Sequence, residues 1–250
     1  MTLIGALLFV TLMVCLYTLH KVRKIHLMSH SLHDSSERNT NDLYHQLEIL
    51  IGLYVDLGLT KSLSGTRGWA ASPDFLMELV KYARREKPTT VVECSSGTST
   101  LVLARCMQLN GGGKVYSLEH DPVYAQQTTL NLARHGLSEF AEVILAPLES
   151  LTASGESWSW YEHKLLPDTG PIDMLVIDGP PTATGPLARY PAGPALFPRL
   201  SGHASVFLDD AARPSEQSIL ARWKTEFPQL LFSSAFCEKG CAILRRSAAA

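Results

Sequence analysis

Three aspartates end two apolar runs of the chain. Asp178 ends the run from Ile172, and Asp209 and Asp210 end the run that starts at Ala204. If both runs are strands of one parallel sheet, their carboxyl ends meet at one crevice. Carboxylates crowded there repel one another unless they are protonated or share a cation, and their oxygens suit Mg²⁺, Mn²⁺ or Ca²⁺. The alternative has no metal, with Asp178 facing a bound ligand and Asp209 capping a helix.

A turn of small residues and a later acid form a second group. Glu93–Thr100 reads Glu-Cys-Ser-Ser-Gly-Thr-Ser-Thr, and Glu119 ends the next apolar run, 26 residues after Glu93. Such a turn lets the backbone approach a ligand and directs helix N–H groups at it. An acid at the second strand end can accept hydrogen bonds from both ribose hydroxyls of a nucleoside. Because Gly97 is a poor match to the dinucleotide pattern G-x-G-x-x-G and the turn has no basic residue, the site favours a nucleoside without a pyrophosphate.

These residues need a sheet to bring them together, and the chain from Thr89 alternates strands with helices. Helices are predicted at Ser72–Glu86, Ser99–Leu109, Pro122–His135 and Pro214–Phe227, with another within Ala188–Leu200, and strands at Thr90–Glu93, Lys114–Glu119, Glu142–Ala146, Ile172–Asp178, Ala204–Asp209, Leu230–Cys237 and Cys241–Arg245. This alternation predicts the α/β class, with a doubly wound, mainly parallel seven-stranded sheet and helices on both faces. The last two strands, joined by a tight turn, predict a hairpin that adds an antiparallel edge strand.

With these motifs in order, the chain resembles class I S-adenosylmethionine-dependent methyltransferases, and most closely a bacterial O-methyltransferase-like group. The resemblance covers roughly residues 68–245, and it is carried by Gly68–Asp74, Glu93–Thr100, Leu118–Asp121, Ile177–Pro181 and Leu208–Asp210. It implies a Rossmann-like sheet and S-adenosylmethionine as cofactor. It also implies that the methionine end lies against Glu93, Ser95, Ser96, Gly97 and Ser99, the ribose against Glu119, the adenine between His120 and the turn at Pro147, and that Asp178 also faces the cofactor.

The acid group is similar to the catechol O-methyltransferase type. In that type, acids at these strand ends bind a divalent ion that holds the acceptor hydroxyl and lowers its pKa. The resemblance makes Asp178, Asp209 and Asp210 candidate metal ligands and, with Arg189, candidate catalytic residues. That type also places a lysine base soon after the first of these acids, whereas here Gly179-Pro180-Pro181 follows and the next lysine is Lys224. Arg189 either clamps an anionic acceptor or has a structural role, and Arg213 is expected to neutralise the acids.

A second departure concerns the loop after the first strand. Ser95 stands where the group has its first loop glycine. If that position requires a positive φ, serine is strained there and cofactor affinity falls. This substitution and the absent lysine leave open a second function, a catalytically inactive, membrane-tethered cofactor-binding or scaffold protein. A nucleotide-dependent oxidoreductase is a third.

The N-terminal segment has the composition of a membrane span. Thr2–Leu19 carries no charge, and 18 helical residues extend about 27 Å, near the thickness of a bilayer core. Lys21, Arg23 and Lys24 follow directly, which favours a cytoplasmic C-terminal domain. A cleaved signal peptide is the alternative, but it lacks a basic n-region and a small-x-small cleavage site. The expected organisation is an anchor at 1–20, a juxtamembrane linker and amphipathic helix at 21–60, a methyltransferase domain at 61–246, and a tail at 247–250.

Amino-acid composition and net charge limit the kinds of partner and compartment that suit this chain. The 250 residues carry a formal charge of −2, with 46% hydrophobic and 18% charged residues, which excludes a disordered chain and argues against nucleic-acid binding through a basic face. Five cysteines, an odd number without regular spacing, form no disulfide framework and fit a reducing compartment. The expected activity is O-methylation of a small-molecule or membrane-associated acceptor, such as a lipid-linked saccharide or a quinone-like phenol. The amphipathic helix at Asn41–Leu57 covers the domain or pairs two copies of the chain.

Overall fold

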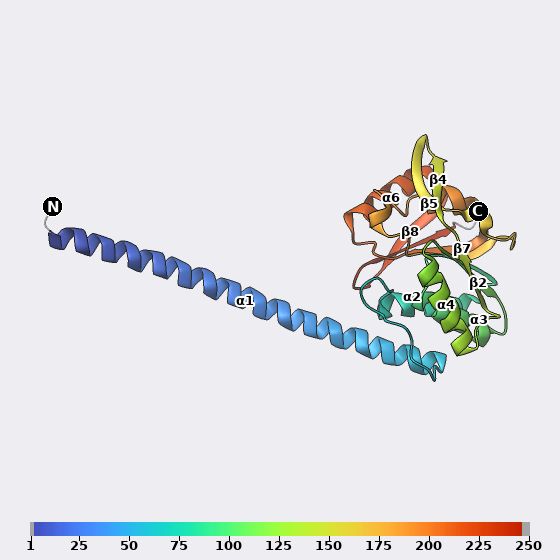
Figure 1. Ribbon diagram of the computed structural model, residues 1–250, viewed down its shortest axis with the longest axis horizontal. Coiled ribbons are helices and arrows are strands. Elements are labelled where there is room, and N and C mark those ends of the chain that lie inside the picture. The colour runs from blue at the N-terminus through green and yellow to red at the C-terminus, as the bar shows by residue number, and fades with distance from the viewer. Residues whose placement is uncertain (1–2, 247–250) are drawn as a thin grey trace. The chain divides into compact units, whose positions relative to one another are not determined.

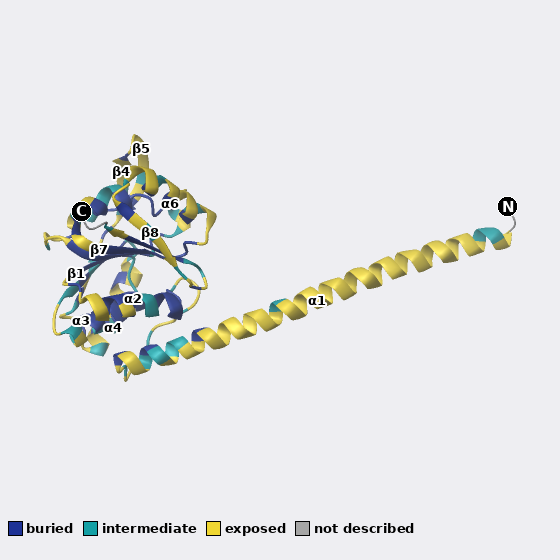
Figure 2. Cartoon of the chain, turned by 180° about the vertical axis from the view of Figure 1, so that it is seen from behind, coloured by how far each residue is buried: buried dark blue, intermediate teal, exposed yellow. Residues whose placement is uncertain are grey.

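The computed structural model describes residues 3–246, so the predicted tail at 247–250 lies outside the described residues. The chain divides into two compact units, Met1–Glu48 and Ile49–Ala250. From Leu3 onward the first unit is helical and belongs to α1 (Leu3–Leu57), whose residues before 49 are almost all exposed (Figure 2). Within α1 lies an 18-residue apolar window, long enough to cross a membrane by length and composition. An N-terminal signal sequence meets the same criteria.

α1 runs without interruption through the segment predicted as a juxtamembrane linker and into the predicted amphipathic helix. The sequence offers a physical reason: neither glycine nor proline occurs between Gly5 and Gly52. Acid–histidine pairs one turn apart also suit a helix, with His30 Nδ1 lying 3.3 Å from Asp34 Oδ2. In the second unit, the end of α1 buries Leu53 and Leu57 in the domain core.

The second unit contains the predicted sheet (Figure 1). Its strand order is β3-β2-β1-β6-β7-β9-β8. The strands are β1 (Thr90–Cys94), β2 (Lys114–Glu119), β3 (Ala141–Leu145), β6 (Ile172–Ile177), β7 (Leu200–Leu208), β8 (Leu230–Ala235) and β9 (Cys241–Arg246). All of the pairings among the first five are parallel. The sequence therefore predicted the class, the strand number and most of the directions.

The closing hairpin differs from the expectation in one respect. β9 is antiparallel, as predicted, but it pairs with both β7 and β8 and so lies inside the sheet. The edge strand is β8. The chain leaves a space beside β7 and forms β8 on the far side of it. The tight turn after β8 then returns the chain, and β9 fills the space between β7 and β8.

Helices cover both faces of the sheet. One core joins the sheet to α2 (Pro73–Glu86), α3 (Thr98–Asn110) and α4 (Pro122–His135). The opposite core contains α5 (Ala192–Leu196), α6 (Pro214–Glu226) and the hairpin described next. Short 3₁₀ turns lie at His163–Leu165, Thr182–Thr184 and Phe197–Arg199.

A two-stranded hairpin lies between β3 and β6 in the chain, in an insertion where no strand or helix was predicted. It consists of β4 (Leu148–Ala153) and β5 (Glu156–Tyr161), paired antiparallel. Both turn residues, Ser154 and Gly155, have positive φ angles of 51° and 78°, which suits a two-residue hairpin turn. The end of β5 buries Trp160 and Tyr161 in the core, so the hairpin is fixed to the domain at its base.

Candidate active site

A cavity of about 730 Å³ lies beyond the carboxyl ends of the central strands. Its lining joins the two groups that the sequence singled out: the loop Ser95–Ser99 and Glu119 on one side, and Asp178, Asp210 and Arg189 on the other. His120 also lines it. The expectation that the loop around Gly97 and the carboxylate of Glu119 face one crevice is therefore confirmed.

Glu119 is held in place by the loop that it faces. Its Oε2 accepts hydrogen bonds from Ser96 N and Ser96 Oγ, both at 3.0 Å, and its Oε1 accepts one from Asp121 N at 3.0 Å. A carboxylate offers about four lone-pair sites. These three bonds leave Glu119 little capacity for two ribose hydroxyls, although its side chain is rigidly presented to the cavity.

Glu93 and Pro147 do not line the cavity, unlike the other residues that the resemblance assigned to the cofactor. Glu93 is fully buried under the loop, where its Oε2 accepts hydrogen bonds from the hydroxyls of Thr100 and Ser117, the latter at 2.7 Å. Burial raises the pKa of Glu93, and these hydroxyl bonds partly oppose that shift. The structure thus gives Glu93 a positioning role, joining the first turn of α3 to β2.

Ser95 has a φ of 103°, in the region that favours glycine. The backbone strain that was expected for serine if this position has a positive φ is therefore present. Ser95 also lies close to Gly179, which follows the neighbouring strand. A Cβ atom on Gly179 would lie 2.9 Å from Ser95 Cβ and would clash with the Tyr161 hydroxyl. Only glycine fits between these side chains.

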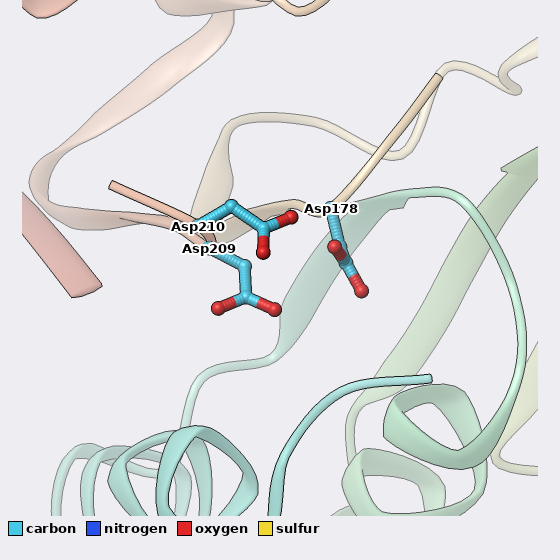
Figure 3. Close-up of side chains that lie close together, drawn as sticks. All are labelled: Asp178, Asp209 and Asp210. Atoms are coloured by element: carbon cyan, nitrogen blue, oxygen red, sulfur yellow. The ribbon is translucent and has the colours of Figure 1, made fainter. Parts of the chain in front are cut away.

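The three predicted aspartates do converge (Figure 3). One oxygen from each of Asp178, Asp209 and Asp210 lies within 4.8 Å of the others. Burial raises the pKa of Asp178 to about 6, and burial together with the charge of Asp178 raises the pKa of Asp209 well above its ordinary value. Among the described residues, neither Asp209 oxygen has a hydrogen-bond partner of normal geometry, and the same holds for Asp210 Oδ1.

Arg189 lies inside this acidic cluster and is 4% exposed. Its Nη2 donates to Asp178 Oδ1 at 3.1 Å and to Asp210 Oδ2 at 2.8 Å, and its Nη1 donates to the carbonyl of Asp209 at 2.9 Å. Burial alone would lower the pKa of Arg189, but the carboxylates outweigh it and raise the pKa. Of the two roles expected for Arg189, these contacts favour the structural one, because both terminal nitrogens donate to protein oxygens; its Nε has no hydrogen-bond partner among the described residues.

The charges of the cluster do not balance. Arg213 Nη1 lies 2.8 Å from Asp210 Oδ2, as expected of a residue that neutralises the acids, and Glu216 Oε1 lies 3.9 Å from Arg189 Nε. Four carboxylates against two guanidinium groups leave a formal charge of −2 when all are ionised. Protons or a cation can supply the difference, and the charge of Lys239 also lowers the pKa of Asp178.

Sequence reasoning missed part of the lining. One wall comes from the segment before α2 and from the turn between β8 and β9, and the residues concerned are Arg67, Trp69 and Lys239. Tyr161, at the base of the hairpin, lines the cavity as well, and its ring lies 5.9 Å from that of His120. Although Trp69 lies within the Gly68–Asp74 motif, local patterns do not predict that these residues meet at the site, because they come together only through the packing of distant segments.

The comparison with protein families defines the class. Residues 92–211 match the family model described as a methyltransferase domain. This segment begins in the first strand and ends just after the acids of β7, so it contains the loop, Glu119 and the acidic cluster. Over this segment, which is slightly less than half of the chain, the protein is similar to a methyltransferase domain, and its fold is that of solved methyltransferases.

Within that class, the solved structures that are similar to this chain include O-methyltransferases. An O-methyltransferase from Bacillus cereus, solved with S-adenosylhomocysteine, is 17% identical with a TM-score of 0.56, over 81% of this chain and 90% of that chain. The O-methyltransferase TomG from Streptomyces achromogenes, solved with S-adenosylmethionine, is 15% identical with a TM-score of 0.53, over 78% and 86%. A putative caffeoyl-CoA O-methyltransferase from Staphylococcus aureus is 14% identical with a TM-score of 0.57, over 83% and 99%. At these identities the likeness establishes the fold. No curated protein sequence matched the chain.

Proposed function

We propose that this methyltransferase transfers the methyl group of S-adenosylmethionine to an oxygen of its acceptor. The observation that carries the proposal is the single cavity with the loop Ser95–Ser99 and Glu119 at one end and the acidic cluster at the other. The acceptor oxygen attacks the methyl carbon, the C–S bond breaks with its electron pair passing to sulfur, and the hydroxyl proton leaves to a base or to water. Little covalent work is needed from the protein, so holding the two reactants in line and excluding water supplies most of the rate.

The cofactor fits the loop end of the cavity. The Ser95–Ser99 backbone and the N-terminus of α3 suit the methionine end, while Glu119 and His120 suit the nucleoside. Asp178 lines the same cavity. The solved Bacillus cereus and Streptomyces achromogenes O-methyltransferases carry S-adenosylhomocysteine and S-adenosylmethionine, respectively, which supports the same ligand here.

A divalent cation fits the acidic cluster. Asp178, Asp209 and Asp210 would hold it through carboxylate oxygens, and the buried Asp209 carboxylate and Asp210 Oδ1 have no hydrogen-bond partner of normal geometry among the described residues. When bound, such an ion acts as a Lewis acid that lowers the pKa of an acceptor hydroxyl. The residual charge of −2 supports a divalent rather than a monovalent ion. Mn²⁺ binding followed by electron paramagnetic resonance tests this site independently of activity, and unchanged free-ion signals on adding protein would remove the metal from the proposal.

We infer that α1 anchors the enzyme in a membrane with its catalytic domain in the cytoplasm. The uncharged apolar window and the basic residues Lys21, Arg23 and Lys24 that follow it support this topology. The five cysteines are free, as expected in a reducing compartment. The acceptor is then a small molecule or a membrane-associated compound. Alkaline extraction of membranes and protease digestion of intact and permeabilised cells test the anchor and its orientation, and protein released by alkali would contradict it.

Ligand binding separates this function from an inactive scaffold. Ser95 and the largely occupied Glu119 are the features that favour the scaffold. Titration of the full chain in detergent with S-adenosylhomocysteine should show one saturable site. Absence of binding at millimolar ligand would favour the scaffold.

A further inference from the structure

Trp69 lines the cavity and yet is 78% exposed. The other three tryptophans differ: Trp160 and Trp223 are fully buried and Trp158 is half-buried. A large apolar side chain left open at the mouth of a cavity indicates a surface that a ligand covers.

The backbone on both sides of Trp69 is fastened. Lys239 Nζ donates to the carbonyl of Gly68 and to that of Ala70, each at 3.2 Å. The neighbouring Glu238 N donates to Asp74 Oδ2 at 2.6 Å, which ties the same turn to the start of α2. A single ammonium group therefore joins the carbonyl of the residue before Trp69 to that of the residue after it, so the backbone that carries the ring is held before a ligand arrives.

A guanidinium group with free donors lies on the same wall. The turn that holds Trp69 packs against the segment leading to Arg213, since a Cβ at Gly240 would lie 2.6 Å from Ala212 N. Arg213 is 45% exposed and lines the cavity, and among the described residues its one acidic partner is Asp210. A guanidinium has five N–H donors, so most of those of Arg213 remain for a ligand. Arg189, in contrast, is buried, and both of its terminal nitrogens donate to protein oxygens.

We propose that Trp69 and Arg213 bind the methyl acceptor, which is a hydroxylated ring compound carrying an anionic group such as a carboxylate or phosphate. The ring stacks on the indole, and the anion pairs with Arg213 at the edge of the acidic cluster. Lys239 is a positioning residue that acts through the backbone of Trp69. This assignment rests on the proposed function, because it places the acceptor in the same cavity as the cofactor.

The test compares acids with their neutral counterparts. Full-length protein in detergent, saturated with S-adenosylhomocysteine, is titrated with glucuronate and 3,4-dihydroxybenzoate and, in parallel, with glucose and catechol. We expect at least one acid to bind about tenfold more tightly than its neutral counterpart and to protect tryptophan fluorescence from acrylamide. Trp69→Ala should weaken the acid about tenfold, and Arg213→Gln should remove the preference for the acid over its neutral counterpart. Both variants should retain wild-type affinity for S-adenosylhomocysteine, which shows that they are folded.

Phe236→Ala is the matched control, because Phe236 is 96% exposed and does not line the cavity. It should bind the acids as the wild type does. Equal affinity for acids and neutral compounds, or no binding of any probe, would overturn the proposal while S-adenosylhomocysteine binding still supports the proposed function. Loss of binding to anionic lipid vesicles in Trp69→Ala, with unchanged acid affinity, would also overturn it and assign the indole to the membrane surface instead. If the wild type binds no S-adenosylhomocysteine, the proposed function itself fails.

Discussion

Replacing Ser95 by glycine should stabilise the protein. A non-glycine residue held in a sparsely populated backbone region costs roughly 1–3 kcal/mol. Glycine removes that strain but loses roughly 0.5–1 kcal/mol through the greater freedom of the unfolded chain. The φ of 103° at Ser95 therefore predicts a net gain of roughly 0–2.5 kcal/mol. In a domain of this size that raises the Tm by a few degrees.

The strain is present in the protein without ligand, so its relief should increase stability more than cofactor affinity. Urea unfolding of full-length protein in detergent measures the effect as a higher midpoint at an unchanged m-value. Ser95→Ala is the matched control, because it removes the hydroxyl, which makes no hydrogen bond among the described residues, but keeps the Cβ and the strain. The reasoning is refuted if Ser95→Gly lowers the midpoint, or if Ser95→Ala raises it equally.

Three further predictions concern the buried charges and the hydroxyl of the site. Arg189→Ala should lower the free energy of unfolding in urea by about 3–5 kcal/mol, because it leaves buried carboxylates without this counter-ion. Arg189→Lys should recover only part of that loss. Wild-type stability of the alanine variant would contradict this expectation. Asp209→Asn should abolish Mn²⁺ binding without lowering the stability of the metal-free protein, since it removes a buried charge that lacks a partner; retained Mn²⁺ affinity would exclude Asp209 as a ligand. Tyr161→Phe should leave the Tm of the free protein unchanged or higher, because the fully buried hydroxyl has no partner among the described residues, whereas Tyr82→Phe, which loses a hydrogen bond to Ser205, should lower it.

The alternation of apolar strands and helices was sufficient to predict the sheet. Strand ends are short-range features, so Asp178 and Asp209 were placed correctly at the carboxyl edge, and their convergence followed from parallel pairing alone. The position of β9 was not predictable in the same way, because the local pattern gives the turn but not which neighbour each strand of the hairpin pairs with.

The site was predicted less completely than the fold. The sequence identified Arg189 as a candidate but could not decide between an acceptor clamp and an ion pair, since the answer depends on its distances to acids at two separate strand ends. Glu93 was assigned to the cofactor, yet its side chain points below the loop to Thr100 and Ser117. The wall formed by Trp69 and Lys239 joins segments about 170 residues apart, and no local pattern records that contact.

Isothermal titration of the full chain with S-adenosylhomocysteine tests most directly whether the pocket beside Gly97 accommodates an adenosyl thioether. The account predicts one site per chain with micromolar affinity, weakened in Glu119→Ala, whose carboxylate fixes the loop, and unaffected in Phe236→Ala. A flat titration at millimolar concentration, or binding indifferent to the Glu119 substitution, would contradict it.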